Sequence, residues 1–251
     1  MQSSHTPIST WFWAAYLMTT QTPGMSAVQF QRQLGLKRYE TAFQILHKLR
    51  TGMVRPERDQ IGAEHPVEVD ECFVGGATRG EGEGVHYKTL VVGAVEVRRR
   101  EKASKRRKVY AGRLRLAVAR DRSAKSLVPF VTTNVVQGAK VRTDAHDGYR
   151  DLCEIHGYTH HSLAMAGNPE NAEKHLPMIH LVFSNLKTWL YGTHHGRVEP
   201  QHLQAYLNEY VFRFNRRFYP MNSFNSVLGI STRVVPPTYA QLYSGTWKHP
   251  K

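Results

Sequence analysis

The sequence is poor in cysteine and contains no long apolar run. Cys72 and Cys153 are its two cysteines in 251 residues, which excludes a fold built on disulfides and indicates a reducing interior. No apolar stretch approaches the roughly 18 residues that a membrane span needs. The start, MQSSHTPIST, lacks the charged and apolar regions of a signal peptide. We therefore expect a protein of the cell interior with no membrane segment.

Acidic residues are also scarce compared with basic ones. Lysine and arginine number 34 against 20 aspartates and glutamates, which gives a formal charge of +14. An excess of this size favours a nucleic-acid partner, because the phosphate backbone attracts basic surfaces. A basic protein with no particular partner, such as a ribosome-associated factor, is the alternative. The hydrophobic content of 41% is that of an ordinary folded protein.

Helical patterns dominate the first part of the chain. Apolar periodicity predicts helices over 8–20, 26–34 and 39–51, with Ser26 as a helix cap and a break at Gly35. Two short helices joined by a glycine-containing turn are typical of a helix-turn-helix DNA-binding segment. A helical hairpin that only packs against the rest of the protein fits the pattern equally well.

The rest of the chain alternates between strand and helix patterns. Together these patterns predict an α/β domain built around a mixed sheet. The expected strands begin at Val67 and follow at 88–97, 112–121, 138–144 and 158–164. The expected helices are 123–135, 147–157, 177–191 and 199–217.

A strongly basic connection, RRREKASKRRK, joins the second and third strands. It spans residues 98–108 and has eight basic residues and one acid. We expect it to lie on DNA phosphates, since each neutralised phosphate adds salt-dependent affinity. The alternative is a solvated hairpin tip. The expected DNA-binding residues are Arg98, Arg99, Arg100, Lys105, Arg106, Arg107 and Lys108.

Two strands carry aspartates where apolar residues would pack better. Asp70 lies inside VEVDECFVGG, where alternation places it on the same face as Glu68, and Asp144 ends the strand in RTDAHDGY. Two carboxylates on adjacent strands can hold a pair of divalent cations about 4 Å apart, the arrangement that cleaves phosphodiesters. Asp147 is more simply a turn residue that caps the following helix.

The helix PMIHLVFSNLKTWLYGTH offers a third ligand. His180 and Lys187 are seven residues apart, almost two turns, and so share one face. Taken alone, His180 is more often a surface histidine than a ligand.

Four motifs in this order resemble bacterial insertion-sequence transposases of the ISXO group. The motifs are VEVDECFVGG, RTDAHDGY, HLVFSNLKTWLYGTHHG and YLNEYVFRFNRR. The resemblance implies a ribonuclease-H-like catalytic domain of the DDE type and metal-dependent DNA cleavage and strand transfer with Mg²⁺ or Mn²⁺. It also implies action as a homo-oligomer on paired DNA ends, in the bacterial cytoplasm and associated with the nucleoid.

The resemblance assigns roles to individual residues. Asp70 and Asp144 correspond to the first two metal ligands, and His180 stands where the third acid, a glutamate, would be. Lys187 corresponds to the basic residue that follows that glutamate by seven positions. Imidazole is softer than carboxylate and brings no charge, so Mn²⁺ would be tolerated better than Mg²⁺. Asn185 is a rival for the third position, and Glu173 a more distant one.

The start of the chain departs from the family pattern. Similar transposases carry a cysteine-paired zinc ribbon ahead of the WFWAAYL helix, and no CxxC pair is present here. We expect a helical segment at 1–55, the catalytic domain at 66–220 and a tail at 221–251. Two rival functions remain: a catalytically dead remnant that only binds DNA, and a structure-selective nuclease that cuts without joining.

Overall fold

The structure is a computed structural model that describes residues 4–22, 24–75, 88–101, 108–152, 155–163, 174–195 and 198–250. The chain forms two compact units. One consists of Met1–Arg58 together with Trp189–Lys251, and the other of Asp59–Thr188. The division into 1–55, 66–220 and 221–251 stays a prediction. None of the helices among the described residues has the length and apolar character that crossing a membrane requires.

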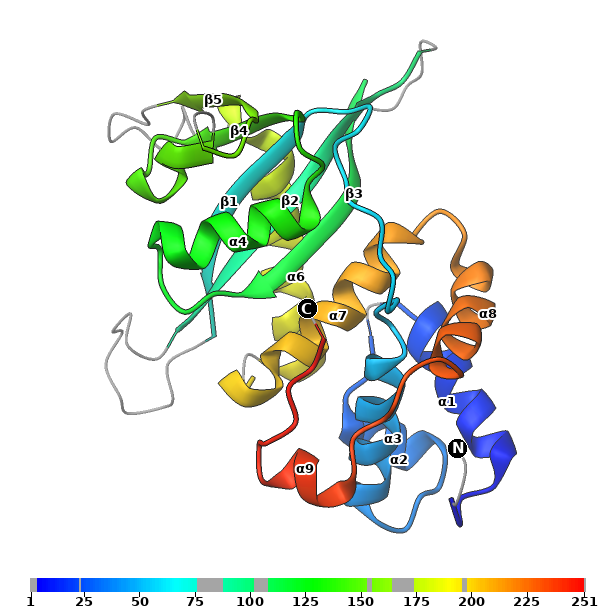
Figure 1. Ribbon diagram of the computed structural model, residues 1–251. Coiled ribbons are helices and arrows are strands. Elements are labelled where there is room, and N and C mark those ends of the chain that lie inside the picture. Colours follow the sequence, from blue (N-terminus) through cyan, green and yellow to red (C-terminus); the bar gives the residue numbers. More distant parts are fainter. Residues whose placement is uncertain are drawn as a thin grey trace. The chain divides into compact units, whose positions relative to one another are not determined.

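The second unit is built around a five-stranded mixed sheet in the order β3-β2-β1-β4-β5 (Figure 1). β1 pairs antiparallel with β2 and β2 antiparallel with β3, whereas β4 lies parallel to β1 and to β5. The strands are β1 (Val67–Val74), β2 (Thr89–Arg99), β3 (Val109–Val118), β4 (Lys140–Asp144) and β5 (Thr159–Leu163). The predicted α/β class with a mixed sheet is therefore confirmed, and it is consistent with a ribonuclease-H-like domain.

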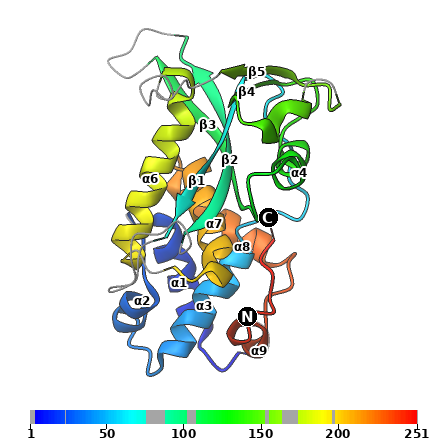
Figure 2. The same cartoon turned by 90° about the vertical axis from the view of Figure 1, so that its left-hand side faces the viewer.

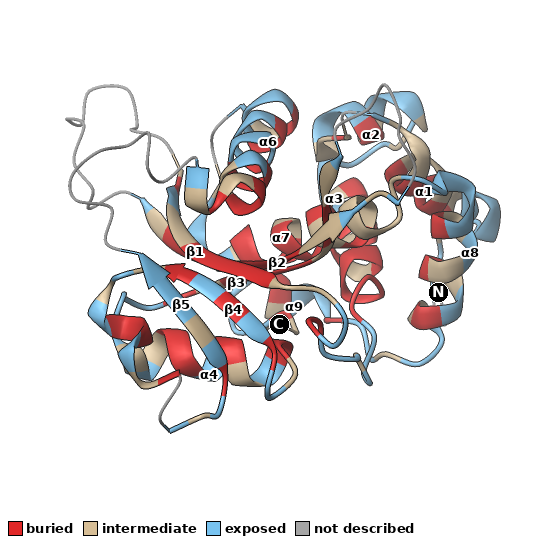
Figure 3. Cartoon of the chain, turned by 90° about the horizontal axis from the view of Figure 1, so that it is seen from above, coloured by how far each residue is buried: buried red, intermediate tan, exposed pale blue. Residues whose placement is uncertain are grey.

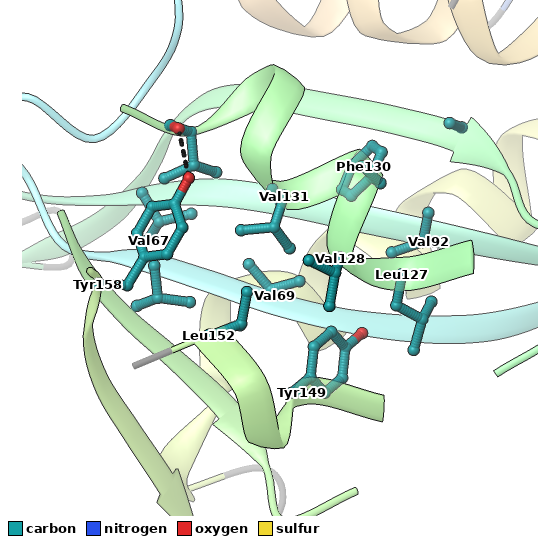
Figure 4. Close-up of a cluster of buried hydrophobic side chains, with 14 of the residues drawn as sticks. Val67, Val69, Val92, Leu127, Val128, Phe130, Val131, Tyr149, Leu152 and Tyr158 are labelled. Carbon is teal, nitrogen blue, oxygen red and sulfur yellow. Dashed lines mark hydrogen bonds between the residues drawn. The ribbon is translucent and has the colours of Figure 1, made fainter. Parts of the chain in front are cut away.

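One face of the sheet is covered by α4 (Ala124–Asn134) and the 3-10 helix η2 (Asp147–Leu152). Val67 and Val69 point from β1 into the hydrophobic core on this side (Figure 4). α4 supplies Leu127, Val128, Phe130 and Val131 to the same core, and η2 supplies Tyr149 and Leu152. The predicted helix 147–157 was wrong in kind over its first part, because Asp147–Leu152 form a 3-10 helix; residues 153 and 154 lie outside the described residues.

The opposite face is covered by α6 (Pro177–His194), which reaches Thr188 before the chain enters the other unit (Figure 2). Gly93 in β2 allows a close approach, since a Cβ there would lie 2.9 Å from a Phe183 ring carbon and 3.0 Å from Ile179 Cδ1. Burial is greatest in the central strands, whereas β5 at the sheet edge is mostly exposed (Figure 3).

The other unit is entirely helical. It comprises α1 (Ile8–Thr20), α2 (Ala27–Gln33), α3 (Tyr39–Thr51), α7 (Pro200–Asn215), α8 (Pro220–Ser231) and α9 (Tyr239–Tyr243). The expected N-terminal helices are present, and the Ser26 side chain accepts a hydrogen bond from the Gln29 amide as a cap should. Residues 221–251, expected only as a tail, form most of α8 and all of α9.

A buried ion pair joins α3 to α7 in this unit. Arg50 Nε donates to Glu209 Oε2 at 2.9 Å, and both side chains are at most 2% exposed. Arg50 also lies over the Tyr206 ring, 4.5 Å from its centroid. Removing Arg50 is costly because the buried Glu209 would keep only its longer contact with Arg213, at 3.4 Å.

We expect Arg50→Met to lower the free energy of unfolding by about 3–5 kcal/mol. The double variant Arg50→Met, Glu209→Leu removes both charges and should recover most of that loss. Urea denaturation followed by circular dichroism measures both values. A double variant as unstable as the single one would mean that packing around Arg50 matters more than its charge.

Several histidines gather beside Arg50. The buried His47 ring lies 5.0 Å from the His202 ring and 5.6 Å from the His249 ring, measured between centroids. Burial and the Arg50 charge hold the pKa of His47 well below its usual 6.5, and the same causes lower the pKa of His249 to about 4. These imidazoles are therefore neutral in the folded protein at neutral pH.

This cluster should make the fold sensitive to acid. As the pH falls below 6.5, these histidines bind protons in the unfolded chain before they do in the folded chain. The free energy of unfolding is therefore highest above pH 6.5 and decreases toward pH 4. For His249 the loss at pH 5 amounts to roughly 2 kcal/mol. His249→Asn should flatten the decline of the melting temperature between pH 7 and pH 5. The same substitution at the exposed His5 is the control, and equal slopes in the two variants would contradict this account.

Candidate active site

The two predicted aspartates meet where β1 and β4 run side by side. The last paired positions of these parallel strands are Glu68 and Arg142, and Asp70 and Asp144 each follow two residues later. Oxygens of Asp70, Asp144 and the neighbouring Glu71 all lie within 4.8 Å of one another. The aspartates are partly accessible, with side chains 13% and 19% exposed. The structure therefore brings together carboxylates that are 74 positions apart in the sequence.

Glu68 anchors α6 to the sheet on the Asp70 side. Its Oε2 accepts hydrogen bonds from the amides of Met178 and Ile179, at 2.8 and 3.0 Å, in the first turn of α6. A carboxylate at this end of a helix satisfies free N–H groups and is favoured by the helix dipole. Burial raises the pKa of Glu68, and the two amides partly oppose that effect. Glu68 therefore has a structural task that explains an acid inside the strand.

His180 comes from the same helix and faces Asp70. Its Nε2 lies 3.3 Å from Asp70 Oδ2. This approach is possible because Gly93 is the cross-strand partner of Asp70 and places no side chain between β2 and α6. The predicted association of Asp70, Asp144 and an imidazole from α6 is thus present in the geometry.

Lys187 is exposed two turns further along α6. The Lys187 side chain lies near Cys72 on β1, because its charge lowers the pKa of the Cys72 thiol. Burial has the larger, opposite effect and raises that pKa to about 12. Asn185 is exposed and lies about 140° around the helix from His180, at 3.6 residues per turn. The remaining candidate, Glu173, lies outside the described residues.

Glu71 is the part of the cluster that sequence reasoning missed. Tyr149 in η2 donates a hydrogen bond from its hydroxyl to Glu71 Oε2 at 2.6 Å, and Arg122 pairs with Glu71 Oε1. The Glu71 side chain is only 2% exposed. Burial raises the pKa of Glu71. Burial also raises the pKa of Tyr149 well above its usual value of 10. Its place directly after Asp70 was the available signal, but strand alternation assigned it to the other face.

The cluster has more negative charge than its neighbours neutralise. Arg122 pairs with Glu71, and its Nη2 lies 3.7 Å from Asp144 Oδ2. Burial raises the pKa of Asp144, and the charge of Asp70 raises it further. A divalent cation would relieve this repulsion, and carboxylate oxygens are the donors that Mg²⁺ and Mn²⁺ prefer. The residues present therefore fit a hard divalent cation.

The predicted DNA-binding residues lie at the ends of β2 and β3. Arg98 is engaged with Glu96 at 2.7 Å, whereas Arg99 is exposed. Although burial opposes the change, hydrogen bonds from Arg113 and Arg98 lower the pKa of Glu96 to about 2. Arg100 lies over the Tyr110 ring, 4.6 Å from its centroid, and Lys108 is exposed. Lys105, Arg106 and Arg107 lie outside the described residues.

The hydrogen bond from Tyr149 should hold Glu71 in place beside the aspartates. We expect Tyr149→Phe to lower the free energy of unfolding at pH 7 by about 1.5–3 kcal/mol, because it leaves a buried charged acceptor without its donor. Tyr158→Phe is the matched control, since the Tyr158 hydroxyl donates to the neutral Val135 carbonyl at 2.9 Å. That variant should cost only about 1 kcal/mol. Urea denaturation measures both losses. Equal losses for Tyr149→Phe and Tyr158→Phe would show that the hydrogen bond to Glu71 is no stronger than one to a neutral carbonyl.

Comparison with known proteins agrees with this geometry. A family model described as the ISXO2-like transposase domain matches residues 62–215, more than half of the chain. The match includes Asp70, Asp144, His180 and Lys187. Searches of curated proteins and of solved structures find no match. The chain therefore belongs to the ISXO2-like transposase domain family, the insertion-sequence transposases of the ISXO group.

Proposed function

We propose that this protein cleaves DNA at the ends of an insertion sequence and joins the released 3′ ends to target DNA. The observation that carries the proposal is the meeting of Asp70, inside β1, with Asp144, at the end of β4, with His180 against Asp70. Family membership supports it, because DDE transposases act on DNA and use divalent metal ions. The formal charge of +14 suits a DNA substrate.

Asp70, Asp144 and His180 would hold two Mg²⁺ or Mn²⁺ ions. When bound, such ions activate the attacking oxygen and stabilise the leaving oxygen in phosphodiester chemistry. Asp70 and Asp144 supply the charge that attracts the cations, and Glu71 adds a carboxylate beside them. Because His180 is a nitrogen donor, the site should accept Mn²⁺ more readily than Mg²⁺.

Other side chains would hold the DNA. Lys187 carries an exposed ammonium on the face of α6 that also bears His180, where it would bind a phosphate near the scissile bond. The basic 98–108 connection would follow the DNA backbone, with Arg99, Arg100 and Lys108 among its contacts. The α2–α3 segment would serve as the helix-turn-helix. We propose a homo-oligomer on paired ends, working with the bacterial nucleoid in the cytoplasm.

Asp70→Asn and Asp144→Asn should each reduce nicking of element-end DNA in Mn²⁺ by at least about 100-fold, because each removes a ligand from the cation site. Asp147→Asn is the matched control: that side chain is 81% exposed and pairs with Arg150 instead. Its activity should stay within about twofold of wild type, since it lies outside the carboxylate cluster. Gel analysis of end-labelled DNA measures nicking and strand joining in one experiment.

The identity of the third ligand can be tested in the same assay. His180→Ala should reduce nicking more than Asn185→Ala, because only His180 reaches Asp70. A histidine at the position where the resemblance expects a glutamate also favours the rival function, a DNA-binding remnant. Tight DNA binding without nicking in any metal would support that rival. Nicking without joined products would instead support a structure-selective nuclease.

A further inference from the structure

The helical unit contains a second site that the catalytic proposal does not use. A cavity of about 620 Å³ opens between α2, α3, the last turn of α6 and α7. Its volume falls within the range of about 300–1,000 Å³ that is typical of ligand pockets. All its lining residues belong to this one unit.

The lining of the cavity suits an anion. Arg32 and Arg50 contribute to its wall, and among the described residues no aspartate or glutamate does. Because Arg50 is already paired with Glu209, the exposed Arg32 is the arginine that can meet an anion. Thr193 is only 5% exposed. The Thr193 hydroxyl and His194 Nε2 are buried atoms that have no hydrogen-bond partner in the described part of the chain. Burial and the Arg50 charge lower the pKa of His194 to about 3, so its ring is a neutral hydrogen-bonding group. The cavity thus offers positive charge together with unused polar atoms.

Aromatic rings make up much of the remaining wall. Tyr206 is fixed between the Arg50 guanidinium, 4.5 Å from its centroid, and the His194 ring at 4.2 Å. Tyr39 lines the cavity, is 42% exposed and lies 6.0 Å from Phe43. An accessible ring beside arginines is the combination on which nucleic-acid bases stack while their phosphates are neutralised.

We propose that this cavity binds one nucleotide of an unpaired DNA strand, with the base against Tyr39 and the phosphate near Arg32. A base in a duplex is stacked and presents only its edges to the grooves. A base can therefore enter an enclosed cavity only when its nucleotide is unpaired. The assignment of DNA as the source of the nucleotide rests on the proposed function. The binding itself needs neither the carboxylate site nor a metal ion.

The test is fluorescence anisotropy with a short labelled oligothymidylate in the presence of EDTA, using the full-length protein. Tyr39→Ser and Arg32→Gln should each weaken binding by at least about fivefold. Arg32→Gln should also reduce the slope of log K against log salt by about 0.7, the value for one contacted phosphate of a single strand. Thermal melting of each variant confirms that it is folded.

Two matched controls lie outside the cavity. Arg233→Gln removes an exposed arginine that follows α8 in the same unit, and Tyr239→Ser removes a tyrosine that is 53% exposed. Both should change the affinity by less than about twofold, as surface substitutions usually do. Controls as damaging as the cavity variants would overturn the proposal, and so would cavity variants that lose duplex binding as strongly as oligothymidylate binding. Competition by thymidine monophosphate as strong as by the oligonucleotide would assign the cavity to a free nucleotide instead of a DNA strand.

The outcome is separable from that of the cleavage assay. Oligothymidylate binding is measured in EDTA and through Arg32 and Tyr39 of the helical unit, whereas cleavage needs a metal ion and Asp70 of the sheet-containing unit. The cavity assignment alone would be refuted if cleavage depends on Asp70 while the Arg32 and Tyr39 variants bind oligothymidylate as wild type does. Binding that depends on Arg32 and Tyr39 in a protein that never cleaves would refute the catalytic proposal alone.

Discussion

The repulsion between carboxylates on two adjacent parallel strands is the constraint on which the site depends. Pairing of β1 with β4 at Val67 and Glu68 holds the two backbones together two residues before Asp70 and Asp144, which keeps these carboxylates close. Burial raises the pKa of Asp144, and the charge of Asp70 adds to this, which shows the cost of the arrangement. Such a cost is tolerated where the function requires concentrated negative charge.

The surrounding fold is arranged to support this concentration of charge. Glu68 receives the first amides of α6 and so fixes where that helix begins. Gly93, directly across from Asp70, lets α6 approach closely enough for His180 to reach the aspartate. On the other face, Arg122 neutralises Glu71 and the Tyr149 hydroxyl donates a hydrogen bond to it. Each of the three acids on β1 thus has partners of its own, and only Asp70 is directed toward both Asp144 and α6.

The imidazole of His180 affects the electrostatics of the proposed site. It adds a nitrogen donor beside Asp70 without adding negative charge. Glu71 brings a further carboxylate to the cluster, although Tyr149 and Arg122 already occupy its oxygens. The site therefore keeps three acidic side chains close together, but all come from β1 and β4 and none from the described part of α6.

The sequence by itself determined the α/β class, the presence of an acid on each of two strands, and the shared helix face of His180 and Lys187, because alternation and helical spacing are local properties. Only the tertiary structure decided the role of Glu71, whose partners Arg122 and Tyr149 are 51 and 78 residues away. Alternation placed Glu71 on the opposite face and gave no reason to count it. The same holds for the cavity beside Tyr39, which forms because Trp189–Lys251 folds together with Met1–Arg58. Contacts between distant segments depend on packing, which no local pattern encodes.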